Sequence, residues 1–117
     1  MSVSGVVPHS RVRGTEETIV ELRREAVSAV ARQRRLLEET AAVRARAGEI
    51  EAQAHRALAK GDELLARQIL ARGLCTLEAR RALEEELAES RRRVAGLLTT
   101  LVRTEDRARG LRCVRPT

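Results

Sequence analysis

The sequence predicts an all-α protein: a long antiparallel two-helix coiled-coil hairpin with disordered basic tails. Three observations predict it. The 117 residues include no Phe, Trp or Tyr, whereas β-strands draw heavily on aromatic residues. Ala, Leu, Glu and Arg dominate the composition, which is typical of long helices and coiled coils. Both prolines, Pro8 and Pro116, lie near the ends, so no proline interrupts the chain between them.

Residues 1–14 are expected to be a disordered tail, because they are small, polar and aperiodic. The first helical arm, about 15–60, is expected to begin at Thr15, a suitable N-cap. Glu16 and Glu17 then occupy the first turn, where the helix dipole favours negative charge. Apolar and small residues follow in alternating steps of three and four, which is the heptad pattern of a coiled coil. The expected seam consists of Ile19, Leu22, Ala26, Ala29, Gln33, Leu36, Thr40, Val43, Ala47, Ile50, Ala54 and Ala57.

The first arm is expected to end at Lys60-Gly61-Asp62, because Gly favours a helix C-terminus and Asp the next N-cap. A turn this short makes the second arm, about 62–110, antiparallel to the first. Its later half has the seam Leu83, Leu87, Ser90, Val94, Leu97, Leu101, Thr104, Ala108 and Leu111. Its early half is expected to contribute Leu65, Ile69 and Ala79, joined by a four-four step at Leu83 that reduces local supercoiling. Residues 111–117 are expected to form a basic tail.

Several apolar residues fall outside this seam. They are Val20, Val27, Val30 and Leu37 on the first arm, and Leu70, Leu74, Leu77 and Leu98 on the second. Two helices cannot cover both the seam and a second stripe, so the pattern predicts further helices there, most simply through self-association. The alternative is that these side chains only broaden the intramolecular seam.

Gly48, Gly73 and Gly96 lie inside the expected helices, where each costs about 1 kcal/mol relative to Ala. A glycine at such a position indicates either the close approach of another helix or a local bend. The alternative is that the helix simply tolerates it.

The sequence gives no indication of an enzyme. His9, His55, Cys75 and Cys113 do not have the spacing of metal ligands, and no Gly-rich phosphate-binding loop is present. The acidic run at 84–86 is typical of an ion-paired helix surface. We therefore expect a non-enzymatic protein with no catalytic residues, no metal and no cofactor. Because no apolar run is long enough to span a bilayer, we expect it to be soluble or peripheral.

The net charge is +6, and most of it lies at the two ends of the chain, while the residues between them are close to balanced. Basic ends suit partners that carry phosphate groups, either anionic lipids or nucleic acid. The candidate anionic-lipid contacts are Arg11, Arg13, Arg107, Arg109, Arg112 and Arg115. An Arg-rich hairpin that binds nucleic acid is the alternative, although the sequence lacks aromatic residues for base stacking. Solubility alone would also explain the charge.

The stretch across the turn resembles the phage shock protein A (PspA) family, also called the vesicle-inducing plastid protein family. The resemblance rests on Ala57-Leu58, a short turn, and the string Glu63-x-Leu65-Ala66-Arg67-x-x-Leu70, with further similarity at residues 16–23. It covers about residues 15–110. The residues expected to pack at the hairpin tip are Ala57, Leu58, Gly61, Glu63, Leu65, Ala66, Arg67 and Leu70.

This resemblance implies a hairpin related to ESCRT-III proteins, in a cytoplasmic protein of bacterial envelope stress and membrane maintenance that is peripheral at the inner face of the membrane. Family members assemble into rings or rods on anionic membranes, and some restrain an AAA+ transcriptional activator. They usually begin with an amphipathic membrane-inserting helix and continue past the hairpin, whereas this chain has only residues 1–14 before the first arm and stops at Thr117. The implied partners are further copies of this chain or a full-length PspA-like protein. A generic coiled-coil adaptor is the remaining alternative.

Overall fold

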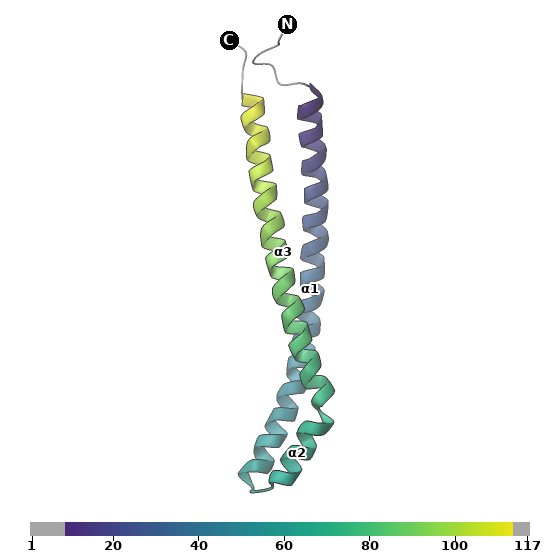
Figure 1. Ribbon diagram of the computed structural model, residues 1–117, viewed down its shortest axis with the longest axis vertical. Coiled ribbons are helices and arrows are strands. Elements are labelled where there is room, and N and C mark those ends of the chain that lie inside the picture. The colour runs from purple at the N-terminus through teal and green to yellow at the C-terminus, as the bar shows by residue number, and fades with distance from the viewer. Residues whose placement is uncertain (1–8, 114–117) are drawn as a thin grey trace. The chain divides into compact units, whose positions relative to one another are not determined.

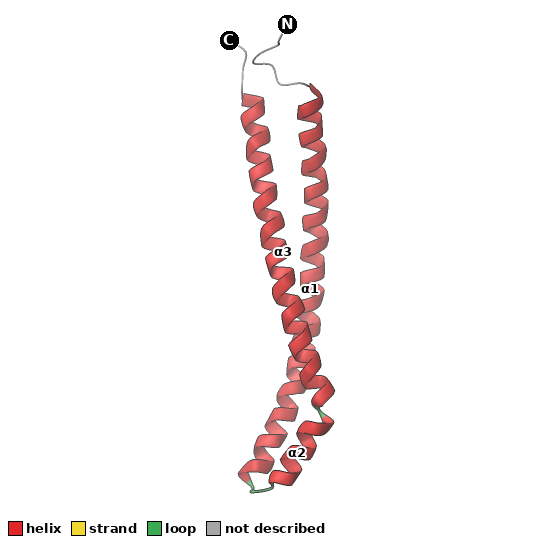
Figure 2. Ribbon diagram, viewed as in Figure 1, coloured by secondary structure: helices red, strands yellow, loops and turns green. Residues whose placement is uncertain are grey.

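Three α-helices make up the computed structural model, which describes the backbone of residues 9–113 and the side chains of residues 14–110. They are α1 (His9–Ala59), α2 (Glu63–Arg72) and α3 (Leu74–Cys113). Figure 1 follows these helices from purple to yellow, and Figure 2 shows that helix covers all but two short stretches between residues 9 and 113. The predicted all-α hairpin class is confirmed.

The chain divides into two compact units. Residues 32–91 form the first, here called the hairpin unit, which contains the end of α1, the turn, α2 and the start of α3. The second, here called the terminal unit, is described over residues 9–31 and 92–113. In each unit the first arm lies antiparallel to the second, as Figure 1 shows.

The seam of α1 follows the predicted heptad along both units. Every residue expected at a seam position is buried or partly buried, including Ala47 at 0% exposure and Thr40 at 1%. Most of these side chains are small, so each turn of the helix buries little apolar area. The predicted seam of the first arm is confirmed.

The seam of the second arm differs from the prediction over its early half. Leu65 and Ala79 are exposed, and Ala66 is buried instead. The predicted four-four step at Leu83 is therefore wrong, because the alternating steps continue without interruption through small and polar residues. The seam positions are Ala66, Ile69, Gly73, Thr76, Arg80, Leu83 and Leu87, and Leu77 and Glu84 beside them are also partly buried.

The helices extend beyond both predicted outer boundaries. α1 begins at His9, so residues 9–14 are helical, and Thr15 lies inside the helix rather than at its N-cap. One glycine, Gly14, costs only about 1 kcal/mol in a helix, and the continuing hydrogen-bonded turns offset that cost. The Thr18 hydroxyl also donates to the Gly14 carbonyl at 2.8 Å. α3 continues to Cys113 rather than ending near residue 110. Residues 1–8 and 114–117 of the predicted tails lie outside the described residues.

Gly73 interrupts the second arm, which was predicted to be one continuous helix. Its N–H donates to the Ile69 carbonyl, and its own carbonyl accepts from the Leu77 N–H, each at 3.0 Å. The hydrogen bonding therefore passes through the junction between α2 and α3, while the helix itself is broken there. Nothing lies within 4 Å of where a Cβ would stand at Gly48 or Gly96, so of these three glycines only Gly73 marks a close approach.

The turn between the arms lies where the sequence predicts it. Gly61 has φ +79°, a conformation that glycine adopts without steric cost. The Gly61 N–H donates to the Leu58 carbonyl and the Asp62 N–H to the Ala57 carbonyl, both at 2.9 Å, which is the Schellman pattern of a helix C-terminus. The Asp62 carboxylate then accepts from the Leu65 N–H at 3.0 Å and caps α2.

Candidate functional site

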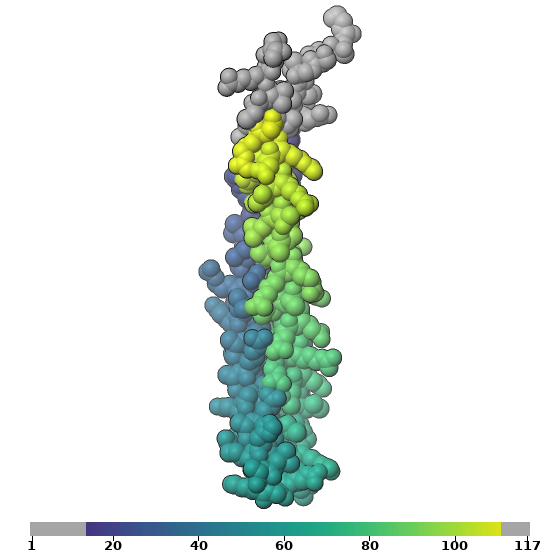
Figure 3. Space-filling model, turned by 90° about the vertical axis from the view of Figure 1, so that its left-hand side faces the viewer, coloured from purple at the N-terminus to yellow at the C-terminus, as the bar shows by residue number. Residues whose placement is uncertain are grey.

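The tip of the hairpin unit buries alanines. Ala57 and Ala66, both expected at the tip, form a buried cluster with Ala54, against which Ile69 packs. In the space-filling view the teal side chains on the two sides of the turn lie against one another (Figure 3). Small side chains let the two helix backbones approach closely, which explains why the short Schellman turn suffices to join them.

Leucines occupy the outside of the same tip. Leu58, Leu65 and Leu70 are 51%, 40% and 39% exposed, so three of the expected packing residues face solvent in this chain. Leu64, which the sequence analysis did not single out, is 68% exposed. The sequence contains a signal for this apolar surface, because Glu63–Arg72 carries apolar residues on every side. A helix of that kind is normally covered all round by other parts of the protein.

Glu63 and Arg67, the remaining expected tip residues, form an ion pair at 2.9 Å across one turn of α2. Both side chains are at least 70% exposed. An exposed pair at this spacing adds only about 0.3–0.5 kcal/mol to the helix. The pair therefore supports α2 locally and does not hold the two arms together.

Ion pairs join the arms along the hairpin unit. Arg44 Nε lies 3.0 Å from Glu84 Oε1, and Arg80 binds both carboxylate oxygens of Glu51 at 2.6 and 3.3 Å. The hydrogen bond from Arg80 lowers the pKa of Glu51 below its ordinary value, and the same bond raises the pKa of Arg80. Arg80 occupies a seam position, where an unpaired charge is unfavourable. Glu51 on α1 neutralises the charge of Arg80.

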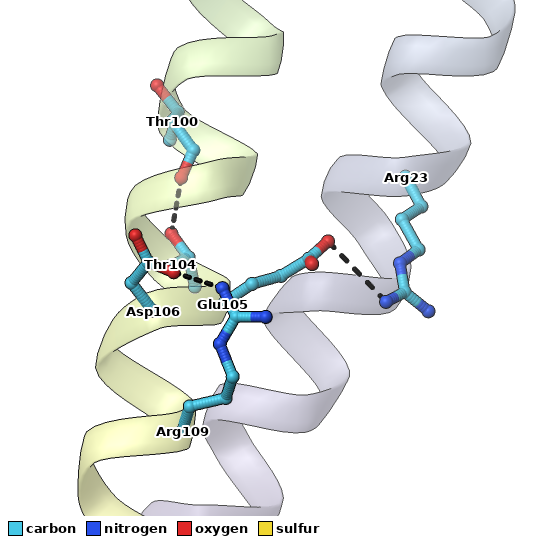
Figure 4. Close-up of polar contacts among 6 residues, drawn as sticks. All are labelled: Arg23, Thr100, Thr104, Glu105, Asp106 and Arg109. Carbon is cyan, nitrogen blue, oxygen red and sulfur yellow. Dashed lines mark hydrogen bonds and ion pairs between the residues drawn. The ribbon is translucent and has the colours of Figure 1, made fainter.

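Figure 4 shows the polar contacts of the terminal unit. Arg23 on α1 reaches Glu105 on α3 at 3.4 Å, Asp106 accepts from Arg109, and the Thr104 hydroxyl donates to the Thr100 carbonyl. The hydrogen bond to Asp106 raises the pKa of Arg109. Among the expected lipid contacts, Arg109 is thus paired within its own helix.

An open groove of about 400 Å³ lies between α1 and α3 beside these contacts. Its lining consists of Glu16, Ile19, Val20, Arg23, Glu105, Ala108 and Arg109. Arg107 is exposed, and no ion pair to it occurs within the described part of the chain. The side chains of Arg11, Arg13, Arg112 and Arg115 lie outside the described residues.

The apolar stripe predicted outside the seam is exposed. Val20, Val27, Val30, Leu37, Leu70, Leu74 and Leu98 face solvent, and Leu77 is partly buried. Val102, 56% exposed, belongs with them although the sequence analysis did not include it. The exposed members do not broaden the seam, so the described surface carries apolar residues that this chain leaves uncovered.

Between residues 9 and 113, no helix is both long and apolar enough to cross a bilayer. In the same part of the chain, no three His, Cys, Asp or Glu side chains gather in a geometry that could hold a metal ion.

Comparison with protein families matches residues 9–113 of the chain to the model described as the PspA/IM30 family. Comparison with curated proteins and with solved structures finds no match. The matched range covers all three helices and the turn between them.

Proposed function

The chain belongs to the PspA/IM30 family, and we propose that it is a non-enzymatic coiled-coil protein that acts at the inner surface of a bacterial membrane during envelope stress. Membership in this family indicates a membrane-associated function of the stress-response type, and the family is not known for enzymatic activity. The family match over residues 9–113 is the observation that carries the proposal. The chain would act through self-association or co-assembly with a longer relative.

Basic residues at the two ends of the chain would supply the attraction to the membrane. Arg107 is exposed on α3, beside the ion-paired Arg109. Each arginine held near an anionic lipid surface contributes about 1 kcal/mol, and the attraction weakens with salt. The proposal therefore predicts binding that depends on lipid charge and on ionic strength.

Co-sedimentation with vesicles tests the proposal. The protein should sediment with phosphatidylglycerol vesicles at low salt, remain in solution with phosphatidylcholine vesicles, and be released as salt rises. The test variant replaces six arginines with Gln: Arg11, Arg13, Arg107, Arg109, Arg112 and Arg115. It should lose most of the binding, because its net charge falls from +6 to 0 and the loss is confined to the ends.

A matched control separates the position of the charge from its amount. It replaces six exposed arginines of the hairpin unit with Gln: Arg34, Arg35, Arg46, Arg56, Arg72 and Arg91. The control has the same net charge and should keep most of the binding. No vesicle binding by the unmodified protein, or an equal loss in both variants, would contradict the proposed role of the ends. A salt-sensitive gel shift of duplex DNA without vesicle binding would favour the nucleic-acid alternative.

A further inference from the structure

The terminal unit carries its large exposed apolar residues on one flank. Val20, Val27 and Val30 on α1 are 50%, 71% and 40% exposed, and Leu98 and Val102 on α3 are 45% and 56% exposed. We call these five residues the valine–leucine flank. They come from both helices of the unit, so the flank is a feature of the pair rather than of either helix alone.

The register of the two helices places these residues on the same side of the seam. The Arg23–Glu105 ion pair crosses the seam there (Figure 4). Val30 lies one heptad after Arg23, and Leu98 lies one heptad before Glu105, so the two occupy equivalent positions across the seam. Val27 is the neighbour of Val30 three residues along α1, and Val102 is the neighbour of Glu105 on α3.

The opposite flank of the terminal unit has no comparable residues among those described. Glu21, Glu25 and Ser28 on α1, with Thr100 and Arg107 on α3, occupy exposed positions there. The apolar surface is therefore one-sided, as expected for a surface that packs against one further layer of helices.

The accessible surface leaves room for a partner. The chain exposes 9068 Å², whereas a folded monomer of 13.0 kDa exposes about 6,300 Å² by the usual size scaling. The excess is larger than the roughly 800 Å² that each partner buries in a standard interface. A second copy could therefore be bound while much of the surface stays in water.

The charges on the flank favour another copy of the same surface. Arg23 and Glu105 neutralise each other, so two such flanks can meet without net repulsion. One heptad away in the hairpin unit, Arg34 takes the place of Val27 and Arg91 the place of Leu98, while Leu37 follows Val30. Lipid headgroups and nucleic acid would require cations that are not already paired, which this flank does not offer.

We infer that a second copy of this chain covers the valine–leucine flank, so that α1 and α3 of the two terminal units form a four-helix arrangement. This inference rests on the self-association included in the proposed function and adds the surface responsible. A two-fold related pair places the same residues on both sides of the interface. Val27 and Val102 are the most exposed members and would be buried by the contact.

Sedimentation equilibrium over a range of protein concentrations tests the inference. The unmodified chain should show a mass of at least twice 13.0 kDa. Val27→Glu combined with Val102→Glu should raise the dissociation constant by about tenfold or more, because it buries charges at the centre of the contact. Val27→Leu with Val102→Leu should retain association, because it keeps the surface apolar.

The control places the same two charges on the opposite flank, as Ser28→Glu with Thr100→Glu, and should associate like the unmodified chain. Circular dichroism checks that every variant keeps its helix content, so loss of association cannot be mistaken for unfolding. A folded Val27→Glu, Val102→Glu variant that associates as tightly as the control would overturn the assignment of this flank and leave self-association standing. An unmodified chain that stays at 13.0 kDa at high micromolar concentration would overturn both.

Discussion

Gly73 lies directly against Ile50. A Cβ built on Gly73 would stand 2.7 Å from both Cδ1 and Cγ2 of the Ile50 side chain, closer than real Cβ contacts come. The Ile50 side chain on α1 therefore fills the space beside the α2–α3 junction, which is open only because Gly73 has no side chain. The broken helix and the heptad seam meet at this contact, because Gly73 occupies a seam position of the second arm.

We expect Gly73→Ala to lower the free energy of unfolding by about 1–3 kcal/mol, the usual cost of overpacking a core. The Ile50 Cγ2 cannot swing away freely, because a β-branched side chain is stiff at its first torsion. Chemical denaturation measures the change. Ile50→Ala should reduce the cost of Gly73→Ala in the double variant, since it removes both clashing atoms.

Gly48→Ala is the control for this prediction. Gly48 lies inside α1 with nothing within 4 Å of its Cβ position, so alanine there should stabilise the chain by up to about 1 kcal/mol through helix propensity. Equal effects of the two substitutions would show that the Ile50 contact does not decide the outcome at Gly73.

Thr40 provides a second prediction. Its side chain is 1% exposed at the α1 seam, and its hydroxyl has no hydrogen-bond partner. A buried polar group without a partner costs about 1–3 kcal/mol, so Thr40→Val should raise the free energy of unfolding by an amount in that range. Thermal or urea unfolding gives the measurement.

Thr104→Val is the matched control, because Thr104 is also a seam residue but its hydroxyl donates to the Thr100 carbonyl at 2.8 Å. Valine there should change stability by less than about 0.5 kcal/mol, since a satisfied hydroxyl leaves no desolvation penalty to recover. If Thr40→Val proved no more stabilising than Thr104→Val, the hydroxyl of Thr40 would have to be satisfied in solution.

The Glu51–Arg80 pair predicts how stability depends on pH. Arg80 lowers the pKa of Glu51 below its ordinary value of 4.5, so the folded state favours the carboxylate. This contribution is present above pH 4.5 and is lost as the pH falls through the lowered pKa of the folded state. Below pH 4.5, Glu51→Gln should therefore lose less of its free energy of unfolding than the unmodified chain. Denaturation at several pH values measures the difference. Glu49→Gln, at an exposed position outside this pair, is the matched control for the change of charge.

The turn supplies a fourth prediction. Gly61→Ala should destabilise the chain by about 1–2 kcal/mol, because φ is +79° and an alanine Cβ disfavours that conformation. Gly61→Asn should cost less, since Asn tolerates the left-handed region better than Ala does. The comparison of the two variants by urea unfolding isolates the backbone effect, because nothing lies within 4 Å of the Cβ position at Gly61. Equal stability of the unmodified chain, Gly61→Ala and Gly61→Asn would contradict the prediction.

Sequence periodicity by itself determined the helical class, the α1 seam and the turn. These features depend on local chemistry: apolar and small residues repeat every three or four positions, and Gly61-Asp62 suits a helix end followed by a cap. The resemblance carried by the residues around Ala57 and Arg67 agrees with the family match. The exposed stripe was also predictable, because two helices have only one mutual seam.

Only the tertiary structure decided which second-arm residues face α1 before Leu83. Leu65, Leu70 and Leu74 there are exposed. Gly73 and Arg80 take seam positions instead, because the Ile50 side chain on α1 fills the space beside Gly73 and Glu51 neutralises Arg80. The sequence of the second arm alone does not identify Ile50 or Glu51 as the contacting residue, since both contacts depend on the register between the two arms. The same register sets Val30 across from Leu98 and so determines that their apolar surfaces share one flank.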